Sequence, residues 1–184
     1  MSSSTRYVAL LRGINVGRAK RIAMADLRAL VEELGFRDVR TLLNSGNVVF
    51  HGARVAPVKA AARIETAIEK QLGITSRVTV LDVDTLATVI AENPLGPVAT
   101  DSSRLFVAVP REPSVLSALA PLRARQWGAE RLAVGTQAAY LWCPDGSIDS
   151  PLSAEVARAL RDHVTTRNWA TTTKLHALAS ESSA

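Results

Sequence analysis

The sequence predicts an α+β protein whose first half follows the ferredoxin-like order β-α-β-β-α-β. Short apolar runs alternate with helix-period patterns, glycines follow the predicted helices, and a tight turn separates two neighbouring runs. The second half is predicted as a degenerate β-α-β-β-α-α arrangement, in which a helix replaces the last strand. No residue-level repeat relates the halves, so this prediction comes from the order of elements alone.

Four apolar runs in the first half predict strands, over residues 7–11, 39–43, 47–50 and 77–81. Helix-period spacing predicts helices over 27–34 and 61–72, which Gly35 and Gly73 end. Because only residues 44–46 separate the second and third runs, these two strands are predicted to form a tight hairpin.

A third helix is predicted around Leu86, Val89 and Ile90, with Asp82 or Asp84 as its cap. The sequence Asn-Pro-Leu-Gly-Pro that begins at residue 93 then breaks the helical pattern. The chain is therefore predicted to divide into a first domain, a linker and a second domain, at residues 1–92, 93–103 and 104–184.

The second half is predicted from the same signals. Strands are expected over 105–109, 131–134 and 138–143, and helices over 114–122 and 170–179. Ser150 is expected to cap a further helix that has Pro151 at its first position and His163 on its apolar face.

The composition favours an anionic partner without naming it. Lys and Arg number 22 against 17 Asp and Glu, which gives a formal charge of +5 and a pI of about 10.0. An excess of basic residues that only keeps the protein soluble is an equally well supported interpretation. No apolar run approaches the roughly 20 residues that span a bilayer, and the first residues do not resemble a signal peptide. A cytoplasmic protein without a membrane partner is expected.

Cysteine and histidine usage argues against a metal site or a disulfide. The single cysteine, Cys143, excludes an internal disulfide, and the three histidines lack the close spacing of metal ligands. No metal and no cofactor are predicted. Cys143 with His163 as its base would be a nucleophilic pair. The favoured interpretation is that both are structural residues, with His163 in the core.

The basic stretch Arg12–Arg21 is the main candidate for a site. In the predicted order the third strand lies between the first two and antiparallel to them, so this loop and the hairpin at 44–47 meet at one edge of the sheet. Backbone N–H groups and cations together favour an anion. The candidate residues there are Arg12, Asn15, Gly17, Lys20, Ser45 and Asn47.

Each of these residues also has a purely structural interpretation. The glycines can serve only to supply positive φ, and the asparagines only to bond local backbone. Arg18 and Arg21 are interpreted first as a solvated surface. The stretch fits neither the P-loop spacing nor the dinucleotide fingerprint. An RNA-recognition module needs aromatics on its third strand, where this sequence has only Phe50.

A second polar stretch, residues 165–174, combines five threonines with candidate ligand residues. Hydroxyl groups and an asparagine ahead of a helix suit N-capping, which is the favoured interpretation. The same groups could hold a phosphate or a carboxylate. The candidate residues in this stretch are Arg167, Asn168, Trp169 and Lys174.

Three stretches, residues 11–17, 45–50 and 166–175, resemble the signatures of the family called domain of unknown function 1697. The resemblance covers about residues 7 to 178. Where the family usually has a second glycine and a proline, this chain has Arg18 and Ala23, which makes the loop more cationic. The resemblance implies a mainly bacterial protein of two α+β parts with ferredoxin-like character and no established activity. The signature residues that it carries over are Arg12, Gly13, Asn15, Gly17, Lys20, Ser45, Gly46, Asn47, Arg167, Asn168, Trp169 and Lys174.

Three functional hypotheses follow. The leading one is a protein that binds an anionic ligand, either a nucleic acid or a phosphorylated small molecule such as a nucleotide, at the basic loop edge. The second is an enzyme of unknown reaction with a cleft between the halves, ranked lower because no acid–base pair is evident. The third is that the signature residues only preserve the fold. The sequence does not indicate an oligomeric state.

Overall fold

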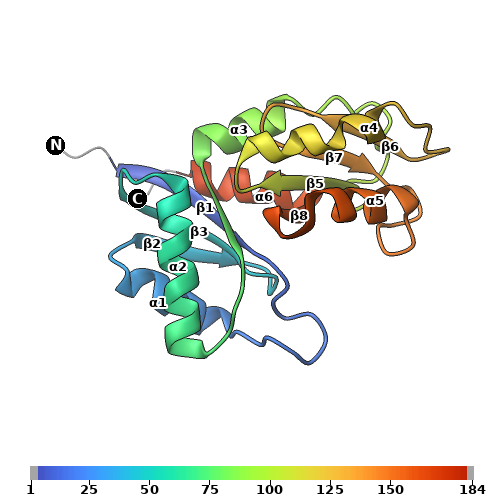
Figure 1. Ribbon diagram of the computed structural model, residues 1–184. Helices are drawn as coiled ribbons and strands as arrows, with labels where there is room; N and C mark the ends of the chain where they lie inside the picture. Colours follow the sequence, from blue (N-terminus) through green and yellow to red (C-terminus); the bar gives the residue numbers. More distant parts are fainter. Residues whose placement is uncertain (1–3, 182–184) are drawn as a thin grey trace. The chain divides into compact units, whose positions relative to one another are not determined.

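The computed structural model describes residues 4–181 (Figure 1). Two four-stranded sheets carry the fold, with strand orders β2-β3-β1-β4 and β6-β7-β5-β8, and every neighbouring pair is antiparallel. The chain groups into two compact units. The first contains the residues up to Leu86 and those from Leu175 onward, and the second contains Ala87–Lys174. The α+β class predicted from the sequence is confirmed.

The first unit is built from β1 (Ser4–Leu11), α1 (Met24–Glu33), β2 (Arg37–Leu42), β3 (Asn47–Ala53), α2 (Pro57–Leu72) and β4 (Val78–Asp82). α1 and α2 pack on one face of the sheet, where apolar residues of the strands meet Leu27, Ile64 and Ile68 in a buried core. The third strand lies between the first two, as predicted. The ferredoxin-like assignment itself stays a prediction.

The opposite face of the first sheet is covered by the end of α6 (Trp169–Ser180). On this face Arg6 Nη1 donates to Ala179 O at 3.4 Å and to Ser180 O at 3.1 Å. Arg40 donates to Leu178 O at 2.7 Å and pairs with Glu181 at 2.6 Å. Two arginines thus satisfy carbonyls at the C-terminus of α6, where a positive charge also complements the helix dipole.

The second unit contains most of α3 (Val83–Ala91) and then β5 (Leu105–Pro110), a 3₁₀ turn (Pro113–Leu119), α4 (Ala120–Arg123), β6 (Arg131–Val134), β7 (Ala139–Trp142), α5 (Pro151–Leu160) and β8 (Val164–Asn168). One face of its sheet packs against the 3₁₀ turn, α4 and α5 through residues such as Leu119, Leu141 and Leu152. On the other face, Tyr140 Oη donates to Val89 O of α3 at 2.7 Å.

The structure corrects two predictions for the second half. A helix does not replace its last strand: β8 pairs with β5 and precedes α6, so the order is β-α-β-β-α-β-α. His163 does not lie in the core: it is exposed, because α5 ends at Leu160 and Arg161, with φ +48, turns the chain away. The predicted linker over 93–103 stays a prediction.

The ends of several helices confirm the sequence signals. Gly73 ends α2 in the left-handed conformation at φ +65. Ser150 Oγ accepts from Ser153 N–H at 2.9 Å, and Pro151 follows at the first position of α5. Of the two candidate caps for α3, Asp82 acts as one, since its Oδ1 accepts from Thr85 N–H at 2.8 Å.

Candidate functional site

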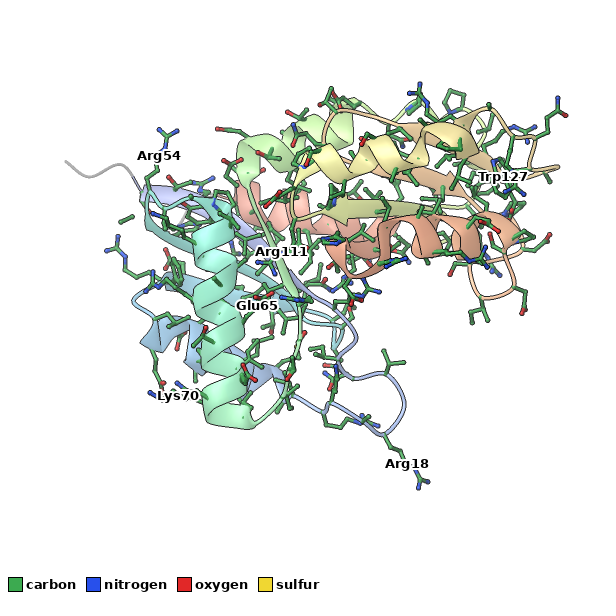
Figure 2. The ribbon with its side chains drawn as sticks, in the orientation of Figure 1. Arg18, Arg54, Glu65, Lys70, Arg111 and Trp127 are labelled. Carbon is green, nitrogen blue, oxygen red and sulfur yellow. The ribbon has the colours of Figure 1, made fainter. Side chains whose placement is uncertain are left out.

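The candidate site begins with the connection between β1 and α1. Ile14 and Ile22 are 2% and 4% exposed and anchor this connection in the core of the first unit. Between them every residue from Val16 to Arg21 is exposed, and Figure 2 shows Arg18 projecting from the tip. The loop is therefore anchored at both ends by buried isoleucines, and the cationic side chains between them are exposed to solvent.

Asn15 closes this loop and joins it to the hairpin. Its Nδ2 donates to Ile22 O at 2.9 Å and to Asn44 O at 2.7 Å, and its Oδ1 accepts from Ile22 N–H at 2.9 Å. The backbone N–H of Asn15 also donates to Lys20 O at 3.0 Å. Since both amide donors are committed, Asn15 shapes the site. The predicted proximity of loop and hairpin is confirmed.

Gly46 allows the hairpin to approach the end of β1 closely. Leu11 N–H donates to Gly46 O at 2.8 Å. A Cβ added at Gly46 would lie 2.7 Å from both Leu11 Cβ and Ile14 Cδ1, and the φ of Gly46 is +76. Glycine is therefore required here for space as well as for backbone conformation.

Asn47 organises the hairpin from inside. It is fully buried at 0% exposure, and its Nδ2 donates to Leu42 O and to Ser45 Oγ, both at 2.9 Å. A ligand at the protein surface would meet the exposed Ser45 and not the buried amide of Asn47. The direct ligand contact predicted for Asn47 stays a prediction.

The backbone of the loop turns repeatedly through the left-handed region. Positive φ occurs at four of its residues, Gly13 (+67), Asn15 (+55), Gly17 (+63) and Lys20 (+49). From Gly13 to Gly17 the sign of φ alternates, which is the backbone pattern of anion-binding nests. Gly17 therefore serves the site through its left-handed backbone conformation, whereas Lys20 has both a left-handed backbone and a positive charge.

A further arginine lies beside Arg12 at this edge. Arg12 N–H donates to Arg77 O at 2.8 Å, and Ser76 Oγ donates to Arg12 O at 2.9 Å. β4 runs antiparallel to β1 with Leu11 opposite Val78, so the start of β4 lies where β1 ends. The loop 12–21 and the hairpin 44–47 contain no Asp or Glu. One carboxylate reaches the start of β4, where Glu65 Oε1 accepts from Val78 N–H at 2.8 Å.

Sequence reasoning missed Arg77 as a site residue, although a signal for it existed. An antiparallel fourth strand beside the first must begin at the edge where the first ends. Arg77 directly precedes that strand. The loop edge, which from here on means the loop 12–21 with the hairpin 44–47 and Arg77, therefore carries Arg12, Arg18, Lys20, Arg21 and Arg77.

The other four predicted site residues belong to the second unit. Asn168 Oδ1 accepts from Thr171 N–H at 2.9 Å, and Thr172 Oγ1 donates to Asn168 O at 2.9 Å. Asn168 thus caps α6, which confirms the capping interpretation of this stretch. Of its neighbours, Trp169 is half-buried and Lys174 is exposed.

Arg167 is a partly buried cation of the second unit. Burial lowers the pKa of Arg167 to about 10, and its Nη1 donates to Thr166 O at 2.9 Å. At neutral pH it still carries its charge. It lies on the edge strand β8, opposite Val107 of β5, and the pairing of these two strands fixes the position of its backbone.

Cys143 has the properties of a structural residue. Its thiol is buried and accepts a hydrogen bond from Ser150 Oγ at 3.4 Å. Burial raises the pKa of the Cys143 thiol, which disfavours the reactive thiolate. Within residues 4–181 no group of three His, Cys, Asp or Glu could hold a metal ion. Over the same residues, none of the helices has the length and apolar character needed to cross a bilayer.

Solved structures show where this fold occurs. A conserved bacterial protein of Streptococcus pneumoniae, SP0830, is 22% identical and aligns with a TM-score of 0.79 over 96% of this chain and 99% of its own. This likeness establishes a shared fold. A protein described as a candidate chlorite dismutase, TA0507, is 12% identical over 95% of this chain and 98% of its own, with a TM-score of 0.23.

No curated protein matches this sequence. A family model described as protein of unknown function (DUF1697) matches residues 4–140, which include the loop edge and both of the first two signature stretches. The resemblance inferred from those signatures is thereby confirmed. The chain belongs to the DUF1697 family.

Proposed function

We propose that the loop edge binds the phosphate groups of an anionic ligand. One observation carries the proposal. Five cationic side chains belong to the loop edge, against the single carboxylate of Glu65 at the start of β4, and the loop that bears most of them is fixed by Asn15. A fixed cationic loop attracts anions without losing much conformational entropy on binding.

The exposure of the loop favours a nucleic acid as this ligand. Residues 16–21 are all exposed, whereas sites for small molecules are usually concave and bury most of the ligand. An exposed row of cations suits a chain of phosphates, because each contact releases condensed counterions. A phosphorylated small molecule offers the same chemical group, and the experiment below separates the two.

The contacts are expected to be to phosphate and not to bases. Residues 11–25 contain no aromatic side chain on which a base could stack. Lys20 and the exposed arginines would meet phosphates, while Asn15 and Asn47 hold the backbone in place. Binding should therefore depend strongly on salt and little on sequence.

Fluorescence anisotropy with labelled single-stranded and duplex DNA of about 20 nucleotides, longer than typical site sizes, tests the proposal. The variant combines Arg18→Gln, Lys20→Gln and Arg21→Gln. It should bind more weakly and lower the slope of log affinity against log salt by up to about 0.9 per lost phosphate contact on duplex DNA. ATP, titrated in parallel, tests the small-molecule alternative.

A charge-matched control combines Arg28→Gln, Arg54→Gln and Lys59→Gln, which remove three exposed cations of the same unit. Figure 2 shows Arg54 at the other end of this unit from Arg18. If both triple variants lose affinity equally, only net charge matters and the site is wrong. Tight binding of ATP with none of DNA would assign the edge to a small molecule. No binding of either probe would leave the signatures with a structural role.

A further inference from the structure

A hollow in the second unit lies at the connection between α4 and β6. Its volume is about 350 Å³, at the small end of the range for ligand pockets. Three arginines line it, Arg123, Arg125 and Arg131, against a single acid, Glu130. All of the residues that line it come from one short stretch of chain, residues 123–132.

An arginine stacked on a tryptophan forms a flat wall of this hollow. The guanidinium carbon of Arg125 lies 4.4 Å from the centre of the Trp127 ring. The ring is itself anchored, because Trp127 Nε1 donates to the carbonyl of the buried Leu122 at 3.0 Å. A guanidinium held on one face by an aromatic ring can offer its other face to a planar ligand, as arginines do for nucleic-acid bases.

The hollow carries a net positive charge, and hydrogen bonds hold one of its guanidinium groups in position. Arg131 Nη1 donates to Gly128 O and, at 2.7 Å, to Glu130 O, which holds its guanidinium. The Glu130 carboxylate accepts from Leu152 N–H at 3.1 Å, so the start of α5 compensates its charge. Arg123, in the last turn of α4, is exposed. Guanidinium groups in such an arrangement bind phosphate through paired hydrogen bonds.

We propose that this hollow is a binding site for a nucleoside monophosphate. Arg123 and Arg131 bind the phosphate, and the base stacks on the face of Arg125 that is turned away from Trp127. The small volume excludes a long polyanion from the interior. This site uses none of the residues of the loop edge.

Isothermal titration of the full-length protein with AMP, GMP, CMP and UMP tests this site, with ribose 5-phosphate and adenosine as partial ligands. At least one nucleoside monophosphate should bind with a dissociation constant below about 1 mM and more tightly than either partial ligand. Arg125→Lys keeps the positive charge but removes the planar guanidinium group on which the base would stack. It should weaken the nucleotide by about tenfold, the loss expected for one stacking contact, and leave ribose 5-phosphate unchanged.

Two controls fix the location of the site. Arg158→Gln removes an exposed cation of the same unit, and the triple variant of the loop edge removes three elsewhere. Both should leave nucleotide affinity unchanged, whereas Arg123→Gln should weaken the nucleotide and ribose 5-phosphate alike. The proposal is wrong if no monophosphate binds more tightly than ribose 5-phosphate, or if Arg125→Lys binds nucleotide as well as the wild type does.

Discussion

The two sheets share one strand order but differ in where their connections are long. In the first unit the chain takes residues 12–23 to pass from β1 to α1, whereas in the second only Arg111 and Glu112 separate β5 from the following 3₁₀ turn. The next connection reverses the relation, with residues 34–36 in the first unit and 124–130 in the second. The longer of these two connections thus lies at a different point of the same topology in each unit. It contains Arg12, Arg18 and Arg21 in the first unit and Arg125 in the second.

This contrast shows which parts of the sequence specify the sheet and which are free for other roles. The order of strands depends on apolar residues that must be buried, and it is the same in both units. The connections are mostly exposed, so their length and charge can change without altering the sheet. We therefore predict that substitutions of the exposed cations in the loop edge weaken the proposed anion binding and leave the sheet intact, provided that the residues that attach the loop to the sheet are kept.

The largest effect on stability is expected where the loop edge touches the core of the first unit. Gly46→Ala would force a Cβ against Leu11 and Ile14 and strain a left-handed backbone. The free energy of unfolding should fall by about 2–4 kcal/mol in urea denaturation, from overpacking and strain together. Gly17→Ala is the matched control, because φ is +63 there but nothing lies within 4 Å. It should cost about 1 kcal/mol. Equal losses would contradict the importance of the close approach.

The next effect concerns the attachment of the loop to the hairpin. Asn15→Gly keeps the positive φ but removes the bonds to Ile22 and Asn44. We expect a loss of about 1–2 kcal/mol and faster amide hydrogen exchange over residues 16–21. Asn44→Ala is the control, since Asn15 bonds the carbonyl of Asn44 and not its side chain. Unchanged exchange in Asn15→Gly would show that other contacts hold the loop.

In the second unit, the corresponding question is whether Asn168 does more than cap α6. Asn168→Ala should cost about 1 kcal/mol, and Asn168→Ser should restore most of it, because serine is also a good N-cap. Thermal unfolding measures both. Failure of serine to rescue stability would mean that the amide has a further role, and would reopen the ligand interpretation of this stretch.

The smallest expected effect is a pH dependence of the free energy of unfolding that arises from His51 in the first sheet. Burial lowers the pKa of His51, Arg6 and Arg40 lower it further, and Asp38, 3.1 Å away, opposes them. The unfolded chain therefore takes up this proton at a higher pH than the folded one, so stability is lost as pH falls below 6.5. Urea denaturation between about pH 7 and 5 should show a shallower decline for His51→Gln. An equally steep decline in His51→Gln would contradict this assignment.

The strands and their neighbours could be predicted because they follow from apolar periodicity and chain order. The proximity of Asn15 to the 44–47 hairpin needed nothing more than the rule for antiparallel placement. β8 escaped prediction because Val164–Asn168 is mostly polar, and its position at the edge of the sheet allows polar residues. The asparagine and threonines of this segment were interpreted as a helix cap. That interpretation accounts for Asn168 at the end of the strand, but it does not predict that the residues before Asn168 form a strand.

Other features could not be predicted because they depend on contacts between distant residues. Nothing in the local pattern shows that Arg161 adopts φ +48 and turns His163 into solvent. The hollow around Trp127 was missed because residues 124–130 have the composition of an ordinary polar loop. Arg125 stacks on Trp127, and the indole Nε1 of Trp127 donates to Leu122 O, neither of which the sequence pattern shows.

The docking of α6 determines how this chain can be dissected. The first unit is discontinuous in the sequence: it stops at Leu86 and resumes at Leu175. Any fragment that ends before Leu175 lacks the carbonyls to which Arg6 and Arg40 donate, and it lacks the cover that Leu175 and Ala179 provide. A recombinant version of the first unit would therefore have to carry residues 175–181 as a fused or added peptide, and binding of that peptide in trans would measure the strength of its attachment directly.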